Sequence, residues 1–491
     1  MQGNNQGIKI GWAQIDITPD RPVFNAGQLY IRVSQYVHDP ITATALVLDN
    51  GADQATLISA DMVGVSPNVL AQMRSNLSAV EGLDVQKISF SVTHTHNSSS
   101  FDIDAFSAAN SRIIGDDILP LQDIPDDIFT GAEATAFLVD KLSELVRSAW
   151  ENRQPGGISY AQDYAAVAFN RRPVFEEDGQ KKTVMYGVCD QKSFKRFEGA
   201  SDHSADMLYT WDRTGRLTGI AVNIPCPSQV FELHCMITAD YWAPTRRQIR
   251  EHLGNVYILP VCGAAGDQNP LDLVRISKDN KKTLLTWGGQ TREVFRNLDM
   301  GLECERIGER ITEAVLRGYR TAGNYIEMNP VFRHRVISMT LPLRMVTEAD
   351  YQEALDRIAE EKAKFSSEHR MTMNEVVALF EPEGVILRWE RQQQSQTFVF
   401  PVHILRLGHL AIATNPFELF CEYGMRMKAR SRSRQTMIIQ LANENGGYLP
   451  TEDALAGGSY SSKPASTKCD PAGGDLLVEN TLNVLNSLWS E

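Results

Sequence analysis

The stretch Ile88-Ser89-Phe90-Ser91-Val92-Thr93-His94-Thr95-His96 joins a short β-prone run to a pair of histidines. Residues 88–92 predict a buried strand that ends just before His94. Side chains two positions apart share one face of a strand, and a bend beyond the strand end lets both rings approach one centre. This geometry suits a metal ion held by His94, with His96 free to act as an acid or base. A histidine pair alone is weak evidence, so the prediction depends on the residues at the ends of the other strands.

Strand-like and helix-like segments alternate along the chain. We expect strands over residues 44–48, 55–59, 164–169, 217–224, 256–261, 331–341, 397–405, 410–413 and 436–441. We expect helices over residues 67–77, 132–150, 244–253, 304–319, 349–365, 417–428 and 476–489. This order predicts an α/β fold with mixed β-sheets layered with helices, because hairpins occur beside the crossovers. We expect a single large domain over residues 8–491, with the polar stretch 277–296 as a long functional loop.

Composition excludes several classes of protein. The 491 residues include 43% hydrophobic and 22% charged residues, which is ordinary for a globular protein, and no apolar run approaches the about 18 residues of a membrane span. A formal net charge of −13 argues against nucleic acid or anionic membrane as the main partner. The seven cysteines are scattered and form no Cys-x-x-Cys pair, which disfavours a disulfide framework and a zinc ribbon.

The first seven residues, Met1 to Gly7, do not identify the compartment. They are polar and contain neither a basic region nor the apolar core of a signal peptide. The protein is therefore either cytoplasmic, or secreted or periplasmic after removal of a signal, and we favour the second. No feature of the sequence marks an oligomer interface.

Side chains suited to chemistry stand after the carboxyl ends of the other predicted strands, where ligands bind in open α/β sheets. Besides the two histidines, they include Asp61, Arg171, Gln229, His234, Asp240, Asn269, Glu418 and Tyr448. Each has an ordinary explanation when taken singly; Glu418, for example, opens a predicted helix, where an acidic residue complements the helix dipole. Their recurrence at one edge of the sheet predicts an active site. The chain has no Gly-x-Ser-x-Gly elbow and no His-Glu-x-x-His helix, which disfavours serine-hydrolase and zincin mechanisms.

The ordered set of motifs resembles the catalytic domain of the neutral/alkaline non-lysosomal ceramidase family over most of the chain. The matching segments are Thr93–His96, Asn170-Arg171, Ile237–Asp240, Gly266–Pro270, Pro416–Glu418 and Gly447–Thr451. The resemblance implies one Zn²⁺ ion held by His94, a second histidine, Glu418 and Tyr448. Ceramidases of this family also carry a β-sandwich domain at the C-terminus. Only some forty residues come after Tyr448 here, so we expect the catalytic domain without that sandwich.

The chain departs from the family pattern at two positions. Counting back from Asp240, the second metal-binding histidine of the family falls on Cys226, whereas His234 lies eight residues later. Thiolate and imidazole both bind zinc, and we take His234 as the ligand with Cys226 as the alternative. The serine nucleophile of the family corresponds to Asn269. An amide cannot attack a carbonyl, but it can donate a hydrogen bond to an oxyanion.

These observations predict a zinc-dependent hydrolase that uses a metal-activated water on an amide or ester bond of a small-molecule, lipid-derived, lactone or sugar-derived substrate. Bound zinc lowers the pKa of its water from about 15.7 to about 7. His96 would move a proton to the leaving group, Arg171 and Asn269 would stabilise the oxyanion, and His203 is a further proton carrier or substrate contact. Two alternatives stay open: a pseudoenzyme or binding protein on the same fold, and a metal-free lyase or isomerase.

Overall fold

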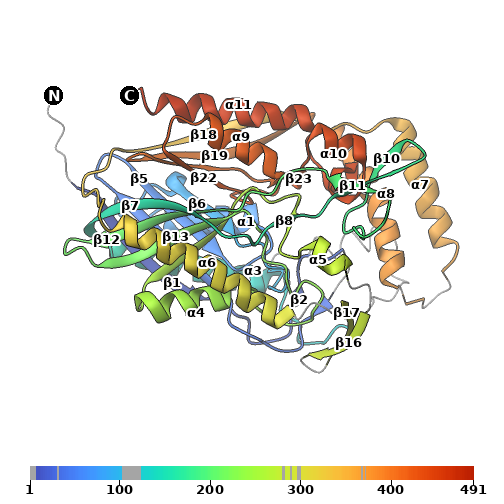
Figure 1. Ribbon diagram of the computed structural model, residues 1–491, viewed down its shortest axis with the longest axis horizontal. Coiled ribbons are helices and arrows are strands. Elements are labelled where there is room, and N and C mark those ends of the chain that lie inside the picture. The colour runs from blue at the N-terminus through green and yellow to red at the C-terminus, as the bar shows by residue number, and fades with distance from the viewer. Residues whose placement is uncertain are drawn as a thin grey trace.

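Two β-sheets pack against each other at the centre of the molecule. Figure 1 shows the computed structural model, which describes residues 7–29, 32–101, 123–278, 282–287, 290–295, 300–365, 369–370 and 372–490. The larger sheet has the order β14-β13-β12-β7-β1-β4-β5-β6, and the smaller has the order β18-β19-β20-β22. Apolar side chains from both sheets, among them Trp12, Leu46, Leu410 and Ile412, form one buried cluster between them. This shared core fixes how the two sheets face each other.

The strands of the larger sheet are β1 (Lys9–Asp16), β4 (Thr42–Asp49), β5 (Gln54–Ala60), β6 (Ile88–Val92), β7 (Gln154–Tyr164), β12 (Ser204–Asp212), β13 (Leu217–Ile224) and β14 (Tyr257–Cys262). Those of the smaller sheet are β18 (Phe332–Pro342), β19 (Thr397–Leu407), β20 (Leu410–Thr414) and β22 (Gln435–Ile439). The short pairs are β2 (Phe24–Asn25) with β3 (Arg32–Val33), β8 (Phe169–Asn170) with β15 (Gln268–Asn269), and β21 (Glu418–Leu419) with β23 (Tyr448–Leu449). A separate sheet contains β9 (Pro173–Glu177), β10 (Gln180–Thr183) and β11 (Phe194–Phe197).

Helices cover the outer faces of both sheets (Figure 1). The larger sheet packs against α1 (Pro67–Leu77), α3 (Gly131–Glu151), α4 (Trp242–Leu253) and α6 (Met300–Ala322). The smaller sheet packs against α9 (Cys421–Arg430) and α11 (Pro471–Ser487). The remaining helices are α5 (Leu273–Ser277), α7 (Glu348–Lys362), α8 (Met373–Gln392) and α10 (Glu452–Gly457). The order of layers is therefore helix, sheet, sheet, helix.

Helix α1 shows how local sequence sets these elements. Ser66 caps its N-terminus by accepting a hydrogen bond from the backbone N–H of Val69, and Pro67 occupies the first helical position, where its missing N–H costs nothing. The apolar residues Val69, Leu70, Met73 and Leu77 recur on one face and are buried against the larger sheet.

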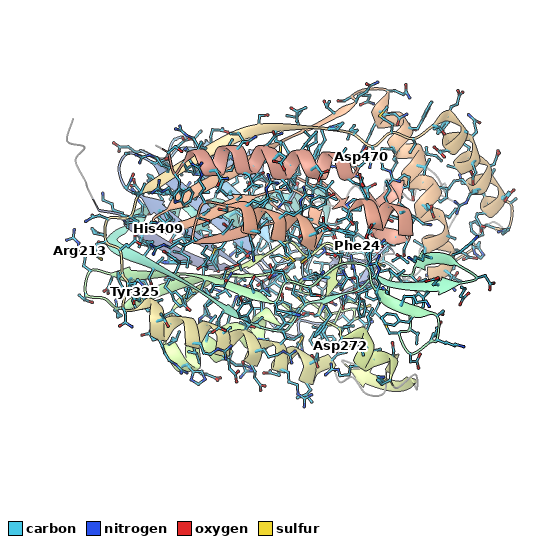
Figure 2. All side chains as sticks on the ribbon, turned by 45° about the horizontal axis from the view of Figure 1, so that its top comes forward. Phe24, Arg213, Asp272, Tyr325, His409 and Asp470 are labelled. Atoms are coloured by element: carbon cyan, nitrogen blue, oxygen red, sulfur yellow. The ribbon has the colours of Figure 1, made fainter. Side chains whose placement is uncertain are left out.

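Within the two central sheets, three pairs of the described strands are parallel, namely β5 with β6, β13 with β14, and β20 with β22. Loops beyond their carboxyl ends meet: the backbone N–H of His96 donates to the carbonyl of Ser228, and Ser91 forms a β-bridge with Ala442. Figure 2 shows Arg213 and His409, which precede β13 and β20, at the end of the molecule away from Phe24. The carboxyl ends therefore converge on the Phe24 side.

The predicted α/β fold with mixed, helix-covered sheets is confirmed, whereas the domain limits 8–491 stay a prediction. Within the segment expected to be a loop, β16 (Lys282–Trp287) and β17 (Gln290–Phe295) form an antiparallel hairpin. In the described parts of the chain, no helix combines the length and apolar character that crossing a bilayer requires.

Candidate active site

His94 lies just beyond β6, where the backbone bends. Its φ of 63° is unusual for a residue other than glycine, and the bend brings the ring centroids of His94 and His96 to 4.9 Å. The His94 Nδ1 atom lies 2.6 Å from the carbonyl of Val63, which can only accept a hydrogen bond, so Nδ1 carries the proton. The His94 Nε2 atom faces Glu418 Oε2 at 3.3 Å and His96 Nε2 at 3.4 Å.

Glu418 reaches His94 from a short strand and not from a helix. Strand β21 pairs in parallel with β23, and Glu418 and Tyr448 are register partners in that pair. The backbone N–H of Glu418 donates to the carbonyl of Gly447 at 2.9 Å, and the helix begins only at Cys421. The predicted start of a helix at residue 417 is therefore wrong, because the β21–β23 pair takes up these backbone groups. A helix-dipole role does not explain Glu418.

Arg171 connects Tyr448, one of the metal-binding candidates, to Tyr186. Its Nη2 donates to the Tyr448 hydroxyl and to the carbonyl of Gly266, both at 2.9 Å, and its Nη1 donates to the Tyr186 hydroxyl at 3.3 Å. The guanidinium lies 5.5 Å from the Tyr448 ring centroid and 5.8 Å from that of Tyr186. Asp267 positions this residue, since its backbone carbonyl accepts from the Arg171 N–H at 2.9 Å.

The site contains two opposite charges, the Glu418 carboxylate and the Arg171 guanidinium, and each favours the charged form of the other. Burial opposes the charge of Glu418, but His94, Tyr448 and Arg171 outweigh it and hold the pKa of this carboxyl below its ordinary value. Burial also opposes the charge of Arg171, yet the oxygens of Tyr448, Tyr186 and Glu418 raise the guanidinium pKa. Burial raises the pKa of Tyr448, so its hydroxyl stays protonated at neutral pH.

His96 is a buried, neutral histidine on the other side of His94. Burial, with the nearby charges of His94, Arg32 and Arg171, holds its pKa well below the ordinary value. Its Nδ1 atom lies 3.5 Å from Glu232 Oε2. The ring packs against Gly27, whose φ is 93° and where a Cβ atom would lie 2.4 Å from the imidazole. Any larger residue at position 27 would displace His96.

Glu232 is a site residue that sequence reasoning missed. Burial raises its pKa to about 7, and it stands two positions before His234, in a segment already singled out for its polar residues. The Asp240 carboxylate shapes this segment by accepting the backbone N–H of Phe231 at 3.0 Å. A lone glutamate in a loop carries no sequence signal, so only the fold reveals it.

Two of the predicted residues make other contacts. The His234 ring packs edge-on against Phe231 with centroids 5.6 Å apart, and the His203 ring packs against Phe169 at 6.2 Å. Among the described residues, no hydrogen bond joins the His203 ring to the cluster around His94, and its Nδ1 is buried without a partner. The roles predicted for His234 and His203 stay predictions.

Asn269 and Cys226, which stand where the family has a serine and a histidine, both have hydrogen-bond partners in the structure. Asn269 Nδ2 donates to the Tyr186 hydroxyl at 2.8 Å, while its Oδ1 accepts the Leu271 N–H at 2.8 Å, which fixes the orientation of the amide. The Cys226 thiol donates to the carbonyl of Val167 at 3.2 Å, and burial raises its pKa well above the ordinary value. Cys226 is thus a protonated, hydrogen-bonded core thiol.

The donor set around His94 can be compared with what zinc requires. Within the described residues, no three histidine, cysteine, aspartate or glutamate side chains form a group that could hold a metal ion. His94 and Glu418 supply two donors, and Tyr448 hydrogen-bonds Glu418. Ligands bound at about 2.1 Å in a tetrahedral site lie about 3.4 Å apart, which matches the 3.3 Å between His94 Nε2 and Glu418 Oε2.

The fold matches solved structures closely along the chain. The crystal structure of neutral ceramidase from Pseudomonas aeruginosa aligns with a TM-score of 0.65 and 15% sequence identity, covering 99% of this chain and 75% of that chain. The chain has the fold of a neutral ceramidase. A second solved structure, a ceramidase complexed with C2, gives a TM-score of 0.66 and 13% identity, covering 99% of this chain and 76% of its own. No family model and no curated protein matches the sequence. The neutral ceramidase fold confirms the resemblance that the motifs indicated.

Proposed function

We propose that this chain is a zinc-dependent hydrolase that cleaves an amide or ester bond. The observation that carries the proposal is the pair His94 Nε2 and Glu418 Oε2, 3.3 Å apart, with Tyr448 beside them. The neutral ceramidase fold supports a hydrolase of this general kind. A small-molecule, lipid-derived or sugar-derived substrate, and a secreted or periplasmic location, are part of the same proposal.

The residues around the pair have complementary roles in such a reaction. His94, Glu418 and Tyr448 would hold the ion, which when bound polarises a carbonyl and lowers the pKa of a water molecule. Arg171 is a fixed, buried cation next to Tyr448, so it would stabilise the negative charge that develops on the carbonyl oxygen.

His96 is the candidate for proton transfer to the leaving group. It is neutral and lies 3.4 Å from His94, so it can accept a proton and then donate it. The proton would come from the water whose oxygen bonds to the carbonyl carbon, and the C–N or C–O bond then breaks as the amine or alcohol takes that proton from His96. His94, His96, Arg171 and Tyr448 are buried, and the low local dielectric strengthens their charge interactions.

Metal content tests the proposal directly. We expect purified protein to contain about one zinc per chain by mass spectrometry, and both His94→Ala and Glu418→Gln to lose most of it. His409→Ala, which changes an exposed histidine, is the matched control and should retain the metal. Hydrolysis of a panel of N-acyl amides, esters and lactones should then stop with a chelator and return with added zinc.

Absence of tightly bound metal in the wild-type protein would favour a binding protein on the same fold. The specific observation behind this alternative is Cys226, whose thiol bonds to Val167 at the position where the family has a metal-binding histidine. Turnover without metal that His96→Ala abolishes would instead favour the lyase or isomerase.

A further inference from the structure

A pocket of about 580 Å³ has Tyr186, a hydrogen-bond partner of Arg171, among the residues that line it. The β9–β10 hairpin forms one wall, and the loop from Val184 to Gln191 forms another. Figure 1 places β10 and β11 beside α10, at the end of the molecule toward which the carboxyl ends of the parallel strands point. The volume is within the range of small-molecule sites, about 300–1,000 Å³.

Strand register explains why one face of the hairpin lines the pocket. Phe175 pairs with Lys182 and Glu177 pairs with Gln180, and side chains two positions apart share a face. These four residues therefore stand together on the pocket side. Lys181 lies between two of them in the sequence and projects from the opposite face, so it provides a natural control.

Tyr186 is the residue that the pocket and the candidate active site share. Its hydroxyl accepts hydrogen bonds from Asn269 Nδ2 at 2.8 Å and Arg171 Nη1 at 3.3 Å, and it lies 3.0 Å from Gln229 Nε2. Tyr186 is also one of the residues that line the pocket. A group bound in the pocket would therefore lie next to a residue whose hydroxyl accepts a hydrogen bond from Arg171.

The backbone of Tyr186 holds a conformation that a bulky residue rarely adopts. Its φ is 58°, and it occupies the third position of a turn closed by the Gly187 N–H and the Val184 carbonyl at 2.9 Å, a position that usually takes glycine or asparagine. Gly187 packs so tightly on Phe175 that a Cβ atom would lie 2.6 Å from that ring. Strain of this kind is retained at functional positions, because the surrounding contacts must compensate for it.

The chemistry of the lining selects a class of ligand. The polar residues that line the pocket are Glu177, Gln180, Lys182 and Gln191, all exposed. One carboxylate and one ammonium balance each other, and the two amides both donate and accept hydrogen bonds. Phe175 and Tyr186 add aromatic surface for a carbon skeleton. Val184 and Val188 add aliphatic surface. This mixture suits a neutral group that carries hydroxyls on a compact carbon ring.

We infer that this pocket is a substrate subsite that binds a neutral, hydroxyl-rich group such as a sugar ring. Tyr186 is the shared wall that places the adjoining amide or ester bond next to Arg171. The inference rests on the proposed hydrolase function for its catalytic readout, but binding to the pocket does not require turnover.

A pair of amides with the same acyl chain tests the inference: N-octanoyl glucosamine and N-octanoyl butylamine. The variants are Gln180→Ala/Lys182→Ala in the pocket and Lys181→Ala on the opposite face. We expect the double variant to raise KM for the glucosamine amide about tenfold with kcat within about twofold, as expected for lost hydrogen bonds made equally in ground and transition states. Lys181→Ala should leave both constants unchanged.

Calorimetric titration of the full chain with N-octanoyl glucosamine separates this inference from the proposed function. Saturable binding that weakens about tenfold in the double variant, and not in Lys181→Ala, supports the subsite even when no hydrolysis occurs. Equal KM values for the two amides in the wild type, or binding that the double variant leaves unchanged, would overturn the subsite while leaving the hydrolase proposal intact.

Discussion

Arg171 donates a hydrogen bond to the Tyr448 hydroxyl at 2.9 Å, across 277 positions of sequence. The same guanidinium also reaches Tyr186, so one buried cation touches both the metal-binding candidates and the wall of the neighbouring pocket. Arg171 therefore links Tyr448 to Tyr186.

Replacement of Arg171 by lysine should impair catalysis more than folding. A lysine ammonium cannot reproduce the planar fork that reaches Tyr448 and Tyr186 together. We expect Arg171→Lys to lower kcat about 100-fold, the usual effect of losing an oxyanion donor, with an unchanged circular dichroism spectrum. Arg213→Lys, at an exposed turn, is the control. A kcat within about twofold of wild type would exclude Arg171 from the reaction.

Removal of the Tyr186 hydroxyl should affect the site through its partners. Tyr186→Phe leaves the Arg171 guanidinium and the Asn269 amide without their shared acceptor, and buried donors left unpaired cost free energy. We expect a loss of about tenfold in kcat/KM in steady-state kinetics. Tyr164→Phe, which changes an exposed tyrosine, should have no effect.

Breaking the buried ion pair between Asp61 and Arg246 should destabilise the protein strongly. Arg246 contacts both Asp61 oxygens, at 2.8 and 2.9 Å, and the Asp61 side chain is fully buried. Asp61→Asn would leave the guanidinium uncompensated, so we expect the free energy of unfolding to fall by about 3 kcal/mol in urea denaturation. Glu305→Gln, which breaks an exposed pair with Arg247, should cost less than about 1 kcal/mol. Equal losses in the two variants would contradict this account.

A second histidine pair, His334 and His403, should make the protein less stable in acid. His334 Nε2 lies 3.0 Å from His403 Nδ1, and burial lowers the pKa of His334 to about 4 and that of His403 well below its ordinary value. Unfolded histidines bind protons below about pH 6.5, so the unfolded state gains protons first and stability falls as the pH decreases from about 6.5 toward about 4. The slope should be about 1.4 kcal/mol per pH unit for His334 alone.

Urea denaturation at about pH 7.5, 6 and 5 measures this slope. In His334→Gln/His403→Gln the decrease in stability between about pH 6.5 and 5 should be smaller than in the wild type, although stability at about pH 7.5 will also be lower. His409→Ala should keep the wild-type slope. A double variant with the full wild-type slope would show that other groups cause the acid sensitivity.

Strand β12 and helix α8 were not predicted from the sequence, and each has a physical reason. Strand β12 is buried on both faces, so it lacks the alternation of apolar and polar residues that marks a strand. Helix α8 contains Pro382, which normally interrupts a helix, yet its Thr372 and Glu375 form a capping box at the N-terminus. In that helix, Gly384 allows close contact with Ala465. Tertiary packing outweighs local preference in both elements.

The sequence by itself determined the alternation of strands and helices, and it placed His94, Arg171, Glu418 and Tyr448 after strand-like segments, because periodicity and strand ends are local properties. Only the tertiary structure decided that Glu418 stands beside Tyr448, that Glu232 approaches His96, and that a hairpin face and Tyr186 line one pocket. Such contacts depend on strand register and on left-handed backbone bends at His94 and Tyr186, which long-range packing imposes and no local pattern encodes.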